Sequence, residues 1–185
     1  LHLPYSPPHP WDTLYSNPKA DTLFNKFWGT MDDVLDFNQG LVEMDSTQLE
    51  IMIGLYDGEL AFTDNQIGRL ISELESRGTL ENTVFIIIGD HGEEFLEHGG
   101  MGHGHTLYQE LLNIPLIISG RYIPAGVNDA VAAQIDILPT LLVMLGFDVP
   151  IWTEGRDILS IDSERTSRYI PSSNLIWATP DLAAV

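Results

Sequence analysis

Apolar residues recur at helical spacing over one long segment of the chain, residues 50–77. The residues that follow this three- to four-residue period are Ile51, Leu55, Leu60, Ile67, Leu70, Ile71 and Leu74. The pair Arg77-Gly78 then supplies a typical C-terminal stop, because glycine tolerates the left-handed backbone that commonly ends a helix. The pattern predicts one long amphipathic helix over residues 50–77.

A different pattern follows immediately, in which apolar residues run without alternation. Residues 83–88 read Thr-Val-Phe-Ile-Ile-Ile, and residues 115–119 read Pro-Leu-Ile-Ile-Ser. Continuous β-branched runs of this length are typical of strands buried on both faces, as in a parallel sheet. A further short strand is expected at residues 131–134. Short helices are expected at residues 106–112 and 136–145, so strands and helices alternate and the fold class is α/β.

Less pattern is visible at the two ends of the chain. Residues 1–20 contain five prolines and no helical period, which predicts an extended, irregular lead-in. Residues 21–50 mix acidic and apolar residues and are expected to form one or two short helices. After Ile161 the chain carries no clear period, so residues 161–185 are interpreted as an irregular tail.

Composition and charge narrow the class of protein. The chain has 185 residues, of which 44% are hydrophobic, and this is the composition of a globular domain. The formal net charge is −19, and Lys19 and Lys26 are the only lysines, which argues against nucleic acid and anionic membrane surfaces as partners. No apolar run approaches the roughly 20 residues of a membrane span. The chain has no cysteine, which excludes disulfides and thiolate chemistry within it.

Candidate chemistry begins directly after the most hydrophobic strand. Ligands of open α/β sheets bind beyond the carboxyl ends of the strands, and Asp90 and His91 follow Gly89 at that position. A carboxylate oxygen and an imidazole nitrogen suit calcium, magnesium, manganese or zinc. The alternative is that Asp90 caps a turn and His91 is an ordinary loop histidine.

Histidines gather in the loop that follows. Residues 91–105 hold four of the six histidines of the chain, together with three glutamates: His91, His98, His103, His105, Glu93, Glu94 and Glu97. An imidazole can stabilise an anionic oxygen or protonate a leaving group near neutral pH. A solvated loop, or one that sequesters metal without catalysis, is the alternative interpretation.

These features stand in a longer series of motifs. In chain order the series is His2-Leu3-Pro4-Tyr5-Ser6-Pro7-Pro8, Tyr56-Asp57-Gly58-Glu59, Thr63-Asp64, Gly89-Asp90-His91-Gly92-Glu93, Glu97-His98-Gly99, the stretch from Gly102 to Glu110, Ile114-Pro115-Leu116-Ile117, the stretch from Gln134 to Leu142, Leu145-Gly146 and Gly155-Arg156-Asp157-Ile158-Leu159. The series resembles the sulfatase family of the alkaline phosphatase superfamily over roughly residues 1–160.

The resemblance implies an alkaline phosphatase-like α/β fold, with a mainly parallel sheet sandwiched by helices. Residues 1–160 would be the later part of the catalytic domain, so the domain is partial. Asp90 and His91 would bind the active-site metal, usually calcium, with manganese, magnesium and zinc as alternatives. His2 would contact the anionic group of the ester.

Several other residues match motifs of this family. His103 or His105 would stand where the family commonly has a lysine that touches the sulfate or the leaving group. Glu93 and His98 match as well and are expected to form loop hydrogen bonds. The remaining matches are expected to be landmarks of the fold: Tyr56, Asp57, Asp64, Asp136, Pro139 and Arg156.

Parts of the family pattern are missing from the chain. The family's nucleophile is a formylglycine made within a Cys/Ser-x-Pro-x-Arg motif, and neither this motif nor two further aspartate ligands occur here. They are expected to precede Leu1, so that residues 1–185 alone would be inactive. A degenerate, non-catalytic homologue is the alternative.

The complete enzyme would hydrolyse small-molecule or glycan sulfate esters. A phosphonate or phosphate ester hydrolase, or a phosphoglycerol transferase, on the same scaffold is the main rival. Family resemblance favours a periplasmic or extracellular location. Nothing in the sequence predicts the oligomeric state.

Overall fold

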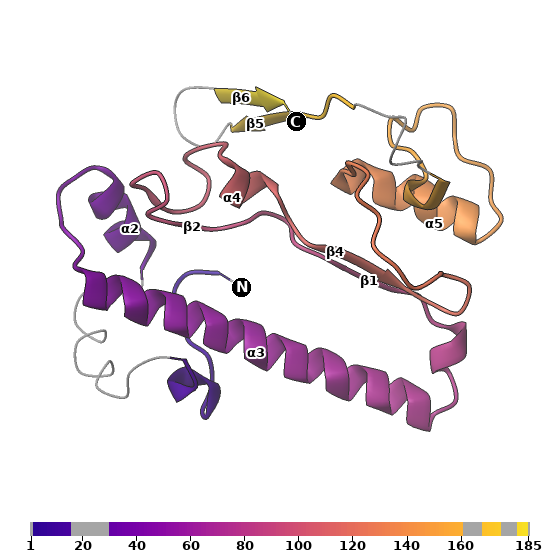
Figure 1. Cartoon of the computed structure of the whole chain (residues 1–185), viewed down its shortest axis with the longest axis horizontal. Helices are drawn as coiled ribbons and strands as arrows, with labels where there is room; N and C mark the ends of the chain where they lie inside the picture. Colours follow the sequence, from indigo (N-terminus) through magenta and orange to yellow (C-terminus); the bar gives the residue numbers. More distant parts are fainter. Residues whose placement is uncertain (1, 16–29, 161–167, 175–180, 185) are drawn as a thin grey trace. The chain divides into compact units, whose positions relative to one another are not determined.

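The computed structural model describes residues 2–15, 30–160, 168–174 and 181–184 (Figure 1). The chain divides into two compact units. The first unit comprises residues 1–103 and 108–121, and the second comprises residues 104–107 and 122–185. The described helices include none that is both long and apolar enough to cross a membrane.

The first unit is built along the helix α3 (Ser46–Ser76), the longest element in Figure 1. Its start is set by a capping box: the Asp45 carboxylate accepts from the Gln48 N–H at 2.8 Å, and the Gln48 side chain accepts from the Asp45 N–H at 2.9 Å. Its end is followed by Gly78 with φ +66°. The predicted long helix is confirmed, and it begins four residues before the predicted range of 50–77 because the cap decides where it starts.

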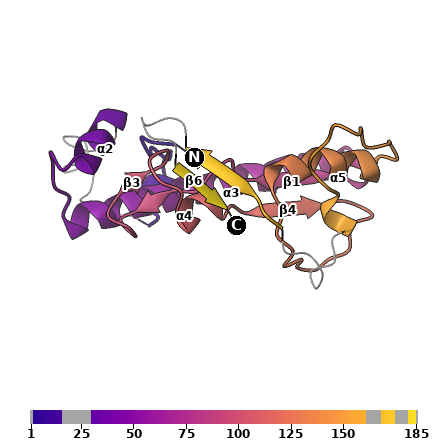
Figure 2. The same ribbon diagram turned by 90° about the horizontal axis from the view of Figure 1, so that it is seen from above.

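Two short helices accompany α3. The 3-10 helix η1 (Trp11–Thr13) contacts α3, and Figure 2 shows α2 (Met31–Asn38) close to the N-terminal end of α3. Thr30 caps α2 through a capping box with Asp33. The expectation of an irregular lead-in and of a short helix before residue 50 is therefore met within the described residues; residues 16–29 lie outside them.

The buried core of the first unit lies near the N-terminal half of α3. It consists of five side chains with at most 7% of their surface exposed: Leu3, Tyr5, Val34, Met52 and Met101. Tyr56 and Phe95 pack against this core, with the Tyr5 and Tyr56 ring centroids 5.4 Å apart. Tyr56 is thus the packing landmark that the sequence predicts. The core ties the N-terminal segment to the loop that carries the histidines.

The two predicted strands form, but they pair differently from the expectation. After η2 (Leu80–Asn82), β1 (Phe85–Ile88) pairs antiparallel with β4 (Leu116–Ser119), with Ile88 opposite Leu116. Figures 1 and 2 show the two strands side by side. The β1 side chains are half-buried, and those of β4 alternate between half-buried and exposed. The prediction that both strands are buried on both faces, as in a parallel sheet, is therefore wrong. An apolar run specifies a strand, whereas strand direction depends on the connection between the strands.

The long connection between β1 and β4 holds small elements. A short hairpin, in which β2 (Glu94–Phe95) and β3 (Met101–Gly102) have two residues each, is followed by α4 (Gln109–Leu112). The expected helix over residues 106–112 is confirmed in its second half. The connection keeps the histidine-rich loop close to the carboxyl end of β1.

The second unit contains α5 (Ile137–Met144), which confirms the helix expected at residues 136–145. It is preceded by η3 (Gln134–Asp136) and followed by η4 (Ile158–Ser160). The strand expected at residues 131–134 is wrong, because the Ala133 N–H is bound at 2.8 Å by the Asp136 carboxylate and the chain enters a 3-10 turn instead.

The C-terminal tail contains regular structure within its described residues. The strands β5 (Pro171–Asn174) and β6 (Asp181–Ala184) pair antiparallel, with Pro171 opposite Ala184. The sequence predicts an irregular tail here. Backbone pairing, which does not require an apolar pattern, accounts for the difference.

Candidate active site

The loop after β1 is held by close backbone contacts. The Gly89 N–H donates to the Pro115 carbonyl at 3.2 Å, and the Gly92 N–H donates to the Leu111 carbonyl at 2.9 Å. A Cβ atom on Gly92 would lie 1.8 Å from the Glu110 carbonyl oxygen, so only glycine fits. This contact folds the chain back against α4 and leaves residues 90 and 91 at the end of the strand.

Asp90 and His91 stand at this end with their potential ligand atoms facing each other. Asp90 Oδ2 lies 3.7 Å from His91 Nε2, and the Asp90 side chain is 89% exposed. His91 Nδ1 is 2.8 Å from the Gly92 carbonyl, which can only accept, so in the neutral ring the proton lies on Nδ1 and the lone pair on Nε2. Although burial opposes it, hydrogen bonding to backbone groups and the nearby His91 hold the pKa of Asp90 below its ordinary value.

The divalent metal that the family resemblance implies would fit these two residues. An exposed carboxylate beside an imidazole whose Nε2 is available, and whose Nδ1 is anchored to a carbonyl, is the usual arrangement of a metal-binding histidine. The described residues at this end of β1 could thus offer one oxygen and one nitrogen ligand to such a metal.

His103 lies directly beside His91. The two rings are stacked, with centroids 3.9 Å apart, and the His2 ring meets His103 edge-on at 5.0 Å. Gly102 brings the chain to this point with φ +82°, and a Cβ there would lie 3.2 Å from a methyl carbon of Val34. The structure therefore brings three of the predicted site histidines together, from the N-terminal segment, the end of β1 and the end of β3.

These three histidines share one hydrogen-bonding arrangement. The Nδ1 atoms of His2, His91 and His103 each lie 2.7 to 2.8 Å from an acceptor, namely the carbonyls of Leu3 and Gly92 and the carboxylate of Glu93. In each ring Nε2 is consequently the nitrogen that remains for a ligand. His105, the alternative to His103, is half-buried and belongs to the second unit.

Glu93 has a partner that the sequence pattern does not indicate. Its carboxylate is 2.8 Å from His103 Nδ1, and its side chain is 5% exposed. This hydrogen bond raises the pKa of His103 above its ordinary value, although burial acts in the opposite direction. Spacing gives no sign of the pair, because the two residues are ten positions apart and lie on either side of a hairpin.

A second group of side chains lies further along the loop. Glu94, His98 and Glu110 each offer one ligand atom, and these atoms lie within 4.8 Å of one another. The buried Glu94 carboxylate accepts from the His98 and Gly100 N–H groups at 3.1 and 2.8 Å. His98 Nδ1 lies 2.5 Å from Glu110, and its ring stacks on Tyr108. These contacts hold the loop, in line with the loop hydrogen bonds expected of His98.

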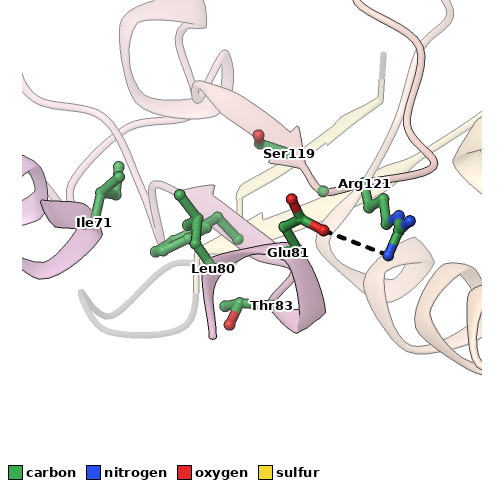
Figure 3. A pocket seen from close by; sticks show the side chains of 8 residues that line it. Ile71, Leu80, Glu81, Thr83, Ser119 and Arg121 are labelled. Atoms are coloured by element: carbon green, nitrogen blue, oxygen red, sulfur yellow. Dashed lines mark ion pairs between the residues drawn. The ribbon is translucent and has the colours of Figure 1, made fainter. Parts of the chain in front are cut away.

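A cavity of about 420 Å³ lies at the opposite end of the β1–β4 pair (Figure 3). Its rim carries an ion pair of 3.5 Å between Glu81 and Arg121. Ile71, Leu80 and Phe85 give it apolar walls. None of the predicted site residues lines it.

Comparison with known proteins settles the family. The profile of the Sulfatase family matches residues 2–147. The chain belongs to the sulfatase family. An arylsulfatase of Clostridium perfringens is 27% identical over 180 residues, covering 91% of this chain and 37% of that protein. The multifunctional alkaline phosphatase superfamily protein PehA of Trinickia caryophylli is 30% identical over 125 residues, covering 65% of this chain and 24% of that protein.

A solved structure supports the fold. The crystal structure of a protein designated a sulfatase from Bacteroides thetaiotaomicron matches with a TM-score of 0.67 at 20% identity, over 78% of this chain and 32% of that one. The expected fold class, a partial α/β domain of the sulfatase type, is confirmed. The chain spans between 24% and 37% of the length of these three relatives.

Proposed function

We propose that this sulfatase-family chain contributes the metal-binding and anion-binding end of a sulfate ester hydrolase. One observation carries the proposal: Asp90 and His91, at the end of β1, lie beside His103 and His2, and all three imidazoles have Nδ1 anchored and Nε2 available. Within this proposal residues 1–160 are the later part of the catalytic domain.

Asp90 and His91 would hold the metal through a carboxylate oxygen and Nε2. Calcium is the first candidate, and manganese, magnesium and zinc are alternatives. When bound, a divalent cation supplies charge neutralisation for the ester oxygens and lowers the pKa of an attacking oxygen. The Gly92 carbonyl, by accepting from His91 Nδ1, would leave Nε2 as the nitrogen that binds the metal.

His2 and His103 would act on the ester itself. His2 is exposed and would bind the anionic group, while His103, with its Nδ1 on Glu93, would bind the ester or protonate the departing alcohol through Nε2. The contact of His103 with His91 favours it for this role, and His105 is the alternative.

The test measures hydrolysis of p-nitrophenyl sulfate by the natural gene product and by its Asp90→Asn variant. Loss of a metal ligand is expected to lower both the affinity for calcium and kcat/KM by about a hundredfold or more. Glu75→Gln, which removes the same charge from an exposed position on α3, should change neither. Equal calcium affinity and equal turnover in all three proteins would contradict the assignment of Asp90.

Phosphate ester hydrolysis is a second candidate, because PehA, a multifunctional member of the superfamily, is among the relatives. Aryl sulfate, aryl phosphate and diaryl phosphate with the same leaving group separate the two. A higher kcat/KM for the sulfate is expected. A higher value for either phosphate ester would favour the second candidate, and no turnover of any ester would indicate a non-catalytic homologue.

A further inference from the structure

We propose that Glu93 is a positioning residue, which holds the His103 ring through Nδ1 so that Nε2 faces the ester at the end of β1. The inference rests on the proposed function for the identity of that ester. It assigns Glu93 a task other than the loop hydrogen bonds expected from its motif.

The geometry of the pair is specific. Glu93 Oε1 lies 2.8 Å from His103 Nδ1, and the exposed fractions of the two side chains are 5% and 15%. A carboxylate hydrogen-bonded at Nδ1 selects the tautomer that leaves Nε2 for chemistry. A buried carboxylate is costly unless it is hydrogen-bonded, so burial favours a well-defined partner over a solvated one.

The surroundings restrict both partners. His91 stacks on one side of the His103 ring at 3.9 Å, and His2 meets it edge-on at 5.0 Å. The Glu93 carboxylate lies near the buried Tyr5, whose ring belongs to the core of the first unit. The pair thus connects a well-packed core to the histidine cluster, as required of a group that orients another.

The adjacent glutamate performs the loop function instead. Glu94 accepts from the backbone N–H groups of His98 and Gly100, which lie within the hairpin loop. The Glu93 carboxylate instead faces side chains: the His103 imidazole at 2.8 Å and the nearby Tyr5 phenol. The two neighbouring carboxylates therefore have different partners: Glu94 binds the loop backbone, and Glu93 binds a side chain.

The first test observes the ring directly in the ¹⁵N-labelled chain. Two-bond ¹H–¹⁵N spectra distinguish the imidazole tautomers, and the Nδ1–H form is expected for His103. Glu93→Gln can donate to Nδ1 as well as accept from it, so a mixture of tautomers is expected. Glu93→Ala should shift the ring resonances further. Glu97→Gln, which removes a carboxylate from the same loop, should leave His103 unchanged. Unaltered His103 resonances in both Glu93 variants would overturn the proposal.

The second test is kinetic and uses the natural gene product. Removing an orienting carboxylate is expected to lower kcat by about ten- to a hundredfold, with KM changed much less. A change in stability alone would leave kcat per folded molecule intact, and that outcome would overturn the positioning role. If the unaltered protein hydrolyses no ester, the proposed function fails, while the spectra still decide whether Glu93 orients His103.

Discussion

Buried carboxylates serve different purposes in the two units of this chain. In the second unit Asp136 is completely buried and accepts from the Ala133 and Arg156 N–H groups at 2.8 and 2.9 Å, and from the guanidinium of Arg168. In the first unit Glu93 is nearly as buried but is bound to the His103 imidazole. A carboxylate surrounded by backbone donors stabilises the fold, whereas one that binds an imidazole controls a group capable of chemistry.

Glu94 lies between these two cases. It is fully buried and accepts from the backbone, as Asp136 does, yet it belongs to the loop that carries the candidate site. Leu96 within that loop has φ +73°, an uncommon conformation for a residue other than glycine. The comparison predicts that substitutions at Asp136 and Glu94 reduce stability, while substitution of Glu93 acts mainly on reactivity.

The largest effect is expected for Asp136→Asn. The change removes the charge that faces Arg168, whose side chain is 14% exposed, and puts an amide donor against existing donors. Breaking a buried ion pair from one side costs about 3–5 kcal/mol of unfolding free energy. Hydrogen exchange of residues 131–158 measures the loss, with Asp148→Asn at an exposed position as control. Hydrogen-exchange protection equal to that of the unaltered chain would contradict the stabilising role of Asp136, on which the comparison with Glu93 rests.

A smaller effect is expected for Glu94→Gln. The amide oxygen of glutamine can still accept from the His98 and Gly100 N–H groups, so the loss is that of charge-assisted bonds, about 1–2 kcal/mol. Exchange of these two amide protons should accelerate roughly tenfold, which corresponds to about 1.4 kcal/mol. Glu75→Gln on α3 is the control. A loss as large as that at Asp136 would show that the charge of Glu94 matters more than its hydrogen bonds.

The smallest effect is expected for Tyr5→Phe, and only in alkali. Burial raises the pKa of Tyr5 above its ordinary value, and the Glu93 carboxylate adds to the rise. The unfolded phenol ionises near pH 10 while the folded one keeps its proton, so folding is fully favoured below about pH 10 and loses stability above it. The phenylalanine variant should lose less stability between about pH 9 and 11.

Alkaline unfolding followed by phenolate absorbance measures this difference. Part of the loss should remain in the Tyr5→Phe variant, because burial also raises the pKa of Tyr56. Identical alkaline unfolding of the two proteins would mean that Tyr5 ionises in the folded state. That result would contradict the close packing of Tyr5 beside Glu93.

The sequence by itself determined the elements whose signals are local. The apolar period of residues 50–77 predicts α3, and β-branched runs predict β1 and β4. The series of motifs along the chain is enough to indicate the sulfatase family, and the family profile bears this out. Asp90 and His91 are candidates for a related reason, since they directly follow a strand. Helix and strand propensity and sequence motifs all depend on residues that are close together in the sequence.

Tertiary structure alone decided how these elements and side chains meet. The antiparallel direction of β1 and β4 follows from the path of the chain between them, and the turn at residues 133–136 follows from a hydrogen bond to Asp136. The pairing of Glu93 with His103, and of Glu94 with the loop backbone, depends on the β2–β3 hairpin. A carboxylate in a sequence does not specify its donor, because any donor brought within about 3 Å by folding can become its partner.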